Sequence, residues 1–367
     1  MHGTTRRQHL QALGLALLAP GAARAQPAFE GVRPRALVFP RDHGAHPDTR
    51  TEWWYVTGSL AAEDHSVFGF QVTFFRSRTE VPRDHPSRFA ARQLLFAHAA
   101  LTDLPQQRLR HDQRIARAGF GIAEAAQDDT RVVLRDWRFE RREGEHGSLY
   151  RAQVDSRATG FTLDLELAAT QPLLLQGTGG FSRKGPLPSQ ASHYVSEPQL
   201  RVAGTLRRDG RSARASGRAW LDHEWSETYM PAGAVGWDWI GMNLDDGSAL
   251  MAFRLRTREG STLWGGGSLR RPGQPARVFE GEQAVLFTAG RHWTSPATGI
   301  RYPVQWQVST PAGRFEVRAL LDAQELDSRN STGTVYWEGL SDLLDDQGRR
   351  IGRGYLEMTG YAGGLRI

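Results

Sequence analysis

Residues 161–167 read Phe161-Thr162-Leu163-Asp164-Leu165-Glu166-Leu167, with an apolar side chain at every second position. Successive side chains of a β-strand point to opposite faces, so this alternation predicts a strand with one buried face and one polar face. The same period recurs in residues 70–74, 253–256 and 305–308, and polar turns such as Asp245-Asp246-Gly247 separate such runs at hairpin spacing. No segment after residue 25 shows sustained helical periodicity. The sequence therefore predicts an all-β protein built from antiparallel barrels or sandwiches.

A weak internal repeat divides this β-rich chain into two halves. Trp54-Tyr55-Val56-Thr57-Gly58 and Trp237-Asp238-Trp239-Ile240-Gly241 both place a Trp four residues before a Gly and then enter a predicted hairpin. Residues 177–192 are rich in Gly, Pro and Ser, which is typical of a connection between units. The chain is long enough for two domains. We expect an N-terminal unit over residues 30–195 and a C-terminal unit over residues 196–367.

The N-terminus has the three parts of an export signal. Arg6 and Arg7 lie in a short basic segment without acids, residues 10–18 form a compact apolar run, and Ala23-Arg24-Ala25 supplies small residues around a cleavage point. The apolar run is too short to span a bilayer. The pair of arginines predicts a twin-arginine signal peptide over residues 1–25, removed to leave a periplasmic or secreted protein that is not an integral membrane protein.

Composition narrows the possible functions. The chain has no cysteine, which excludes disulfides and thiolate chemistry, and Lys184 is its single lysine within a net charge of +6. No arginine stripe is interleaved with aromatic residues, so a nucleic-acid partner is not expected. The chain carries 11 Trp, 16 Phe and 8 Tyr, and such side chains either fill a core or line a cavity for an apolar ligand.

Four passages together indicate a family. They are 46–58 (His46-Pro47-Asp48-Thr49-Arg50-Thr51-Glu52-Trp53-Trp54-Tyr55-Val56-Thr57-Gly58), 192–198 (Ser192-His193-Tyr194-Val195-Ser196-Glu197-Pro198), 220–225 (Trp220-Leu221-Asp222-His223-Glu224-Trp225) followed by Gly236-Trp237-Asp238-Trp239, and Tyr336-Trp337-Glu338-Gly339 with 354–361. In these passages the chain resembles the AttH-like lipocalin family, which includes carotenoid 1,2-hydratase (hydroxyneurosporene synthase) and bacterial secreted proteins labelled as hydrolases. The resemblance covers nearly the whole chain after the signal. It implies two lipocalin-like β-barrels in tandem, and it leaves the activity open because fold does not settle function.

The segment Asp222-His223-Glu224-Trp225 is the densest polar cluster of the chain. On a strand, His223 and Trp225 share one face while Asp222 and Glu224 share the other, so either pair could lie beside a ligand. Hydration of an isolated alkene needs an acid that protonates carbon, an aromatic wall that stabilises the cation, and a base that directs water. A carboxyl group in an apolar cavity stays protonated and suits the first role, Trp faces suit the second, and a His suits the third.

We therefore assign candidate catalytic roles to Asp222 or Asp238 as the acid and to His223 as the base. The candidate ligand-binding residues are aromatic side chains of the same passages: Trp53, Trp54, Tyr194, Trp225, Trp237 and Trp239. One difference from the hydratases of the family stands against this assignment. The resemblance implies an acid on the strand after the Asp-His-x-Trp segment, but residues 248–256 contain none. The alternative is that Asp222 and His223 hold together a strand crossing or the seam between the two domains.

Other chemistries fit the sequence less well. His46, Asp48 and Glu52 could be drawn as a metal site, but three such residues in one loop are more often polar groups of a hairpin. His98 alternates within an apolar strand and is expected to be a hydrogen-bonded core histidine. His223-Glu224-Trp225-Ser226-Glu227 lacks the second His of a zinc protease, and no Gly-x-Ser-x-Gly motif supplies a nucleophile. We expect no metal and no organic cofactor.

Two functions remain open at this point. One is a cofactor-independent hydro-lyase that adds water to an isoprenoid or similar apolar alkene. The other is a non-catalytic periplasmic carrier of an apolar molecule that works with an ABC-type envelope transporter.

The signal peptide generates the first testable prediction. Replacing Arg6 and Arg7 with Lys should block processing at or near Gln26, because the twin-arginine pathway reads that pair. Mass spectrometry of the protein in fractionated cells measures both processing and location. Unchanged processing and location would exclude the twin-arginine route, while a general secretory signal could still operate.

Overall fold

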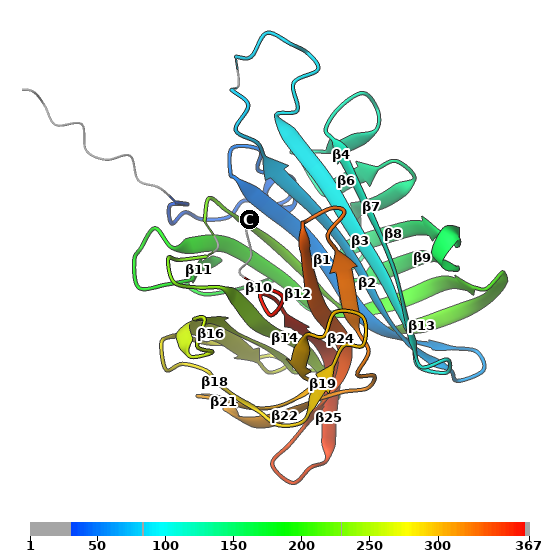
Figure 1. The fold of residues 1–367 in the computed structure, drawn as a ribbon, viewed down its shortest axis with the longest axis vertical. Coiled ribbons are helices and arrows are strands. Elements are labelled where there is room, and N and C mark those ends of the chain that lie inside the picture. Colours follow the sequence, from blue (N-terminus) through cyan, green and yellow to red (C-terminus); the bar gives the residue numbers. More distant parts are fainter. Residues whose placement is uncertain (1–30, 83, 229, 364–367) are drawn as a thin grey trace, which may run out of the picture.

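The computed structural model describes residues 31–82, 84–228 and 230–363, and in these residues the protein is all-β (Figure 1). The helical elements of this part of the chain are two single turns, η1 (Arg41–His43) and η2 (Arg157–Thr159). No helix in the described ranges is long and apolar enough to cross a bilayer. The predicted signal peptide, residues 1–25, lies outside the described residues.

The first sheet is a nearly closed barrel. Its strands run in the order β4 (Arg108–Arg117), β3 (Gln93–Asp103), β2 (Val67–Arg78), β1 (Thr51–Ala62), β13 (Arg211–Ser226), β12 (Ala191–Arg208), β9 (Phe161–Ala168), β8 (Gly147–Ser156), β7 (Trp137–Gly144), β6 (Arg131–Leu134) and β5 (Ala123–Ala125), and the short strands β10 (Leu174–Leu175) and β11 (Phe181–Arg183) pair with β12. The first strand pairs with both the second and the last, so the sheet curls until β4 reaches β6. The open seam lies between β4 and β5.

The second sheet repeats this plan as a half-barrel, drawn in yellow to red in Figure 1. Its order is β17 (Arg277–Gly281), β16 (Thr262–Arg270), β15 (Ala249–Arg256), β14 (Gly236–Leu244), β25 (Arg350–Met358), β24 (Thr334–Leu344), β22 (Gly313–Ala319), β21 (Gln305–Thr310) and β18 (Leu286–Ala289), with β23 (Glu325–Ser328) beside β24 and a separate ribbon of β19 (His292–Thr294) and β20 (Arg301–Pro303). Here too the first strand, β14, pairs with the second and the last. Two antiparallel lipocalin-like barrels in tandem confirm the predicted fold class.

The internal repeat marks equivalent places in the two sheets. Trp54 to Gly58 lies on β1 and Trp237 to Gly241 lies on β14, each the opening strand of its sheet. A Cβ at Gly58 would meet the Phe70 ring, and one at Gly241 would meet the Trp239 ring. Both positions therefore need a residue without a side chain.

The chain passes from the first sheet to the second between Ser226 and Gly236. Strands on both sides of residues 177–192 belong to the first sheet, so this segment does not connect the two sheets. The expected domain boundary at residues 195 and 196 lies inside β12, which pairs with β13 and β9 of the first sheet. Whether residues 30–195 and 196–367 form independent units stays a prediction.

The alternation of β9 confirms the period-two interpretation. Phe161, Leu163, Leu165 and Leu167 are buried in the core of the first barrel. On β2 the polar face of the alternating pattern is buried as well, because Gln71 and Thr73 are as buried as their apolar neighbours. Those two polar residues face the second sheet, and an aromatic cluster with Tyr55, Trp220 and Trp239 fills much of the space between the sheets.

Candidate functional site

A cavity of about 300 Å³ lies between the two sheets. On one side it is bounded by β1, β2, β3 and β13, and on the other by β14, β15, β24 and β25. Its walls are mainly aromatic: Trp53, Tyr55, Phe75, Phe96, Tyr194, Trp237, Trp239, Phe253 and Tyr336. A volume of this size, walled by aromatic rings and containing a few polar groups, is typical of a site for a small apolar molecule.

Strand β13 decides which polar residues reach this cavity. Asp222 and Glu224 line it, whereas Leu221 packs into the core of the first barrel. His223 lies on the same side of the strand as Leu221 and stacks on Trp54, with ring centroids 4.8 Å apart. The two carboxyl groups, and not the His and Trp, therefore stand beside a ligand.

Asp222 is held by three hydrogen-bond donors. Tyr194 Oη donates to Oδ2 at 2.5 Å, Ser196 Oγ donates to Oδ1 at 2.5 Å, and Trp220 Nε1 donates to Oδ1 at 2.7 Å. Burial raises the pKa of Asp222 to about 7 despite these donors. A carboxyl group with this pKa exists in both protonation states near neutral pH, which is what a general acid requires.

Three further carboxyl groups share the cavity, and sequence reasoning did not assign them a role. Burial and the neighbouring Glu357 raise the pKa of Glu338 well above its ordinary value. Burial, together with the charges of Asp222 and Glu224, raises the pKa of Glu357 to about 7. Glu224 accepts hydrogen bonds from Ser192 and, at 2.8 Å, from Lys184 Nζ, so the single lysine of the chain is committed to a carboxylate in this cavity.

A signal for two of these carboxyls was present in the sequence. Glu338 and Glu357 each interrupt an apolar run, in Tyr336-Trp337-Glu338-Gly339 and Tyr355-Leu356-Glu357-Met358. A lone acid inside a buried strand is costly unless it is paired or functional.

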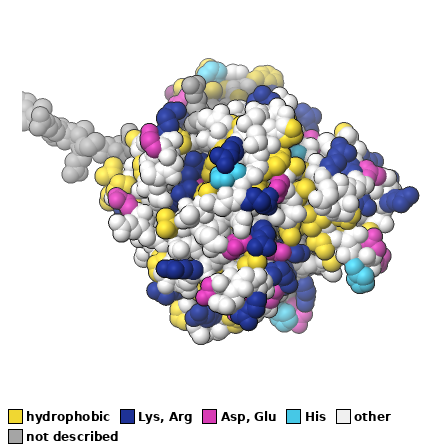
Figure 2. All heavy atoms as spheres, turned by 60° about the horizontal axis from the view of Figure 1, so that its bottom comes forward, with side chains coloured by type: hydrophobic (Ala, Val, Ile, Leu, Met, Phe, Trp, Pro, Cys, Tyr) yellow, Lys and Arg dark blue, Asp and Glu magenta, His cyan; other side chains and the backbone are white. Residues whose placement is uncertain are grey.

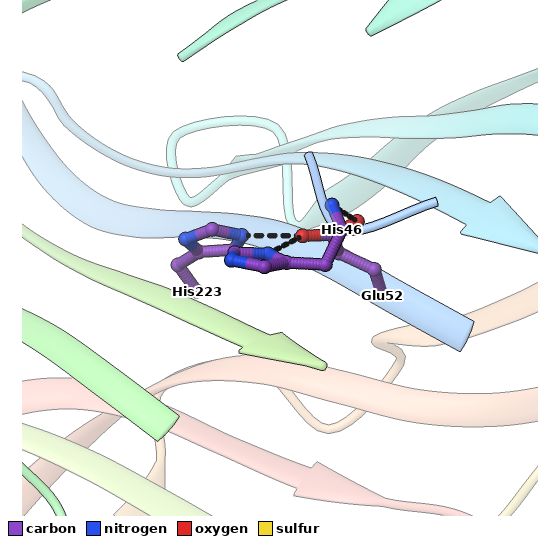
Figure 3. Close-up of side chains that lie close together, drawn as sticks. All are labelled: His46, Glu52 and His223. Carbon is purple, nitrogen blue, oxygen red and sulfur yellow. Dashed lines mark hydrogen bonds and ion pairs between the residues drawn. The ribbon is translucent and has the colours of Figure 1, made fainter. Parts of the chain in front are cut away.

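His223 belongs to a second cluster, on the opposite side of β13 from the cavity carboxyls (Figure 3). Its Nε2 lies 2.9 Å from Glu52 Oε1, and His46 Nδ1 lies 2.7 Å from the same oxygen. Glu52 Oε2 accepts from Arg76 Nε at 2.7 Å and from the His46 backbone N–H at 2.8 Å. We refer to Glu52, His46, His223 and Arg76 as the Glu52 cluster.

The Glu52 cluster fits a structural role. Burial alone would raise the pKa of Glu52, but the bonds to His223 and His46 and the charge of Arg76 hold it well below its usual range. His46 stacks on Trp225, with ring centroids 3.8 Å apart. The cluster joins β1, β2 and β13 to the loop before β1, which is a position that suits the structural alternative for His223. Asp222 lies on the other face of β13, at the seam between the sheets, where Tyr194 Oη bonds both Asp222 and Trp239 of the second sheet.

One oxygen of Glu52 and one ring nitrogen from each of the two histidines lie within 4.8 Å of one another, so this group could be drawn as a metal site. Protein atoms already occupy these positions, because His46 Nε2 bonds Asp42 Oδ1 at 3.0 Å and Arg76 neutralises the carboxylate. A dication would have to displace these bonds and lie next to a guanidinium. The donor set does not favour a metal.

Each of the remaining predicted residues either lines the cavity or faces away from it, according to the strand face on which it lies. Trp53, Tyr194, Trp237 and Trp239 line the cavity. Trp54 is buried in the core of the first barrel, and Trp225 packs within the histidine cluster, so neither lies against the cavity.

Asp238 also lies away from the cavity. It is fully buried between Arg254, at 2.7 Å, and Arg256, at 3.1 Å, and accepts from Tyr361 Oη at 2.9 Å. Its carboxylate is paired with two guanidinium groups, and Asp238 is not among the residues that line the cavity.

His98 is buried and hydrogen-bonded, as predicted, with Nδ1 2.8 Å from Tyr336 Oη and Nε2 2.8 Å from Ser331 Oγ. It also lines the cavity, although burial lowers its pKa well below the ordinary value. It therefore contributes a neutral ring.

Comparison with known proteins decides the family. The AttH-like family model matches residues 30–361. The chain belongs to the AttH-like family. A solved structure of a candidate AttH protein from Nitrosomonas europaea is 46% identical, with a TM-score of 0.82 over 90% of this chain and 98% of that one. The family resemblance of the sequence is thereby confirmed.

Two more distant structures share the fold of this AttH-like protein. Kievitone hydratase from Nectria haematococca is 14% identical, with a TM-score of 0.68 over 88% of this chain and 92% of that one. A structure of CghA with Sch210972 is 12% identical, with a TM-score of 0.50 over 84% and 88%. None of the curated proteins matches the sequence.

The Glu52 cluster generates a stability prediction for this AttH-like protein. Glu52→Gln should lower the free energy of unfolding by about 3–5 kcal/mol, because it leaves Arg76 buried without its carboxylate. Urea denaturation measures the change. The matched control is Glu227→Gln, which removes the partly exposed partner of Arg78 and should cost less than about 1 kcal/mol. Equal losses in the two variants would contradict the structural role of the cluster.

The raised pKa of Asp222 generates a pH prediction. Between pH 4 and 7 the folded protein keeps a proton on Asp222 that the unfolded chain releases, so this group lowers stability as pH rises through that range. Asp222→Asn cannot titrate, so its stability relative to wild type should increase from pH 4 to pH 7, by at most about 4 kcal/mol.

Urea denaturation at several pH values measures this difference, which cancels the titrating groups that do not interact with Asp222 and includes the linked change at Glu357. Asp164→Asn is the control, because Arg151 lowers the pKa of this outward-facing carboxyl and its contribution is lost only as pH falls below about 4. Parallel curves for Asp222→Asn and wild type would show that Asp222 titrates normally.

Proposed function

We propose that this protein binds an apolar or isoprenoid alkene in the cavity between its barrels and adds water to the double bond. The observation that carries the proposal is Asp222, a carboxyl group with a pKa of about 7 inside an aromatic-walled cavity. An apolar wall alone would serve only binding. Protonation of an alkene carbon is the step that makes hydration slow in water, and a positioned acid with this pKa supplies that proton.

The reaction balances with protons and water alone. Protonated Asp222 gives its proton to one alkene carbon, the new C–H bond takes the π electrons, and the other carbon becomes a cation. Water adds to that cation through oxygen, and a base takes the extra proton, which leaves a C–OH bond. Trp237 and Trp239 present faces that can shelter the cation. No step needs a metal or an organic cofactor.

We assign the base role to Glu357 in place of His223. His223 lies across β13 from the cavity and is hydrogen-bonded to Glu52. Glu357 lines the cavity, and the charge of Asp222 contributes to the rise of its pKa to about 7. When Asp222 loses its proton to carbon, Glu357 therefore becomes the better acceptor for a proton from water.

Family and fold support the reaction class. The chain is AttH-like, and one protein that shares its fold is named kievitone hydratase. The proposal extends hydration from that protein to this chain. The second candidate function, a carrier of apolar molecules for an envelope transporter, is favoured by the three donors that satisfy Asp222 as a purely structural acceptor. For either function we propose a location outside the cytoplasm, on the basis of residues 1–25.

Labelled water tests the hydratase. Wild-type protein should incorporate ¹⁸O from water into an acyclic carotenoid or a shorter terpene, detected by mass spectrometry. Asp222→Asn should slow this at least about a hundredfold, since a positioned acid is worth 10²–10⁴ in rate. Asp164→Asn, on the outer face of the first barrel, should leave the rate unchanged.

Thermal unfolding must show that both variants are folded before the rates are compared. Ligand binding by the wild type with no incorporation of label would establish the carrier function and exclude the hydratase.

A further inference from the structure

Three buried polar atoms of the cavity wall make no well-formed hydrogen bond in the described residues, although the Tyr55 hydroxyl and the Glu338 carboxyl lie close enough to interact with each other. They are Tyr55 Oη, Gln71 Oε1 and Glu338 Oε1. Their residues are 7%, 1% and 2% exposed, and all three line the cavity. They come from β1, β2 and β24, so both sheets contribute. An unsatisfied buried donor or acceptor costs about 1–3 kcal/mol, so three at one place call for an explanation.

The surrounding bonds determine what these atoms can accept or donate. Gln71 Nε2 lies 2.7 Å from Glu338 Oε2, 3.2 Å from Tyr336 Oη and 3.1 Å from Thr73 Oγ1. Because acceptors surround the nitrogen, the other amide atom is the oxygen, which only accepts. Tyr55 Oη can both donate and accept. The free atoms therefore require a partner with at least one O–H or N–H and one lone pair.

A hydroxyl group satisfies this requirement with a single heavy atom. It can accept from Tyr55 Oη and donate to Gln71 Oε1 or Glu338 Oε1. A carboxylate offers no donor, and it would enter a cavity lined by Asp222, Glu224, Glu338 and Glu357, besides Glu52, whose carboxylate is paired with Arg76. Lys184 does not compensate for them, because its ammonium bonds Glu224 at 2.8 Å and lies over the rings of Tyr194 and Phe253.

We propose that Tyr55, Gln71 and Glu338 form a subsite for a hydroxyl group carried by the apolar ligand, so that the cavity selects a neutral isoprenoid alcohol over the matching hydrocarbon and acid. The inference rests on the apolar-ligand binding of the proposed function and names the chemical class of the ligand. Tyr55 is paired across the ladder with Asp222, so the hydroxyl end of the ligand enters beside the acid.

Electrostatics agrees with a neutral ligand. Burial and Glu357 raise the pKa of Glu338 well above its ordinary value, which favours its neutral form, and a protonated Glu338 can itself donate to a hydroxyl oxygen. The rest of the cavity offers apolar contact to a chain, from Phe75, Leu94, Phe96 and Ile115 on one side and Phe253 and Leu255 on the other.

Three ligands of one chain length test the subsite. Farnesol, farnesene and farnesoic acid are titrated into the full-length mature protein at pH 7, and the intrinsic Trp fluorescence of the cavity is followed. We expect farnesol to bind at least about tenfold more tightly than farnesoic acid and about fivefold more tightly than farnesene, the size of effect that one or two net hydrogen bonds produce.

The decisive variant is Tyr55→Phe, which removes one hydroxyl and keeps the ring. It should weaken farnesol about fivefold and leave farnesene unchanged. Tyr302→Phe is the matched control, because Tyr302 Oη is likewise buried without a well-formed hydrogen bond, beside a carboxyl group (Glu325), but lies in the core of the second barrel. Glu338→Gln provides a second variant of the subsite, with the same expected loss of preference for farnesol. Circular dichroism melts confirm folding.

The outcomes separate the two proposals. Equal affinity for farnesol and farnesene, or equal effects of Tyr55→Phe and Tyr302→Phe, would overturn the hydroxyl subsite while apolar binding stands. Tighter binding of farnesoic acid would overturn it as well. Failure of all three ligands to bind would remove the apolar-ligand function together with the subsite.

Discussion

The pairing of β1 with β13 determines which residues of the two strands face the barrel core and which face the cavity, and the rest of the structure depends on it. The two strands stay in register from Thr51 opposite Ser226 to Ala62 opposite Ala215, and this ladder joins the strands β1 to β4 to the rest of the first barrel. Over much of its length both faces of the ladder are buried, one against the barrel interior and one against the second sheet. Each residue on it is therefore assigned to the core or to the cavity by its parity alone, and a slip of one position would exchange the two sets.

This parity separates two kinds of buried carboxyl that differ only in their partners. Glu52 faces two histidines and Arg76, which keep it charged and make it a structural acceptor. Asp222 and Glu357 face one another's charge, aromatic rings and hydroxyl groups, so burial keeps a proton on them near neutral pH. The physical difference between Glu52 and Asp222 is a counter-charge within hydrogen-bonding distance, which Arg76 supplies to Glu52, whereas Asp222 is bonded only by neutral donors.

The buried polar groups of the cavity lower the stability of the folded protein. The carboxyl groups of Asp222, Glu224, Glu338 and Glu357, and three polar atoms without a well-formed hydrogen bond, lie where a purely structural interface would place apolar side chains. By contrast, arginines and acids are interspersed on the face shown in Figure 2, which shows no patch of a single sign of charge. Such local departures from good packing are expected at functional sites, where preorganised polar groups await a ligand.

Much of this architecture follows from sequence patterning, whereas the composition of the site depends on tertiary packing. Period-two alternation, as in residues 161–167, specifies antiparallel strands, the Trp-to-Gly repeat marks the opening strand of each sheet, and four passages identify the family. The same parity places Asp222 and His223 on opposite faces of one strand. It does not say which face borders the cavity, because a strand buried on both faces has no polar side to read.

The site itself is assembled by contacts between distant segments. Glu338 and Glu357 come from the second sheet and meet Asp222 only where the sheets pack, and His46, Glu52 and His223 come together only through the β1–β13 ladder. The raised pKa of Asp222 likewise arises from desolvation by residues distant in the chain. Local patterning specifies strands because it acts between neighbours, whereas a cavity is made by long-range contacts that no local pattern encodes.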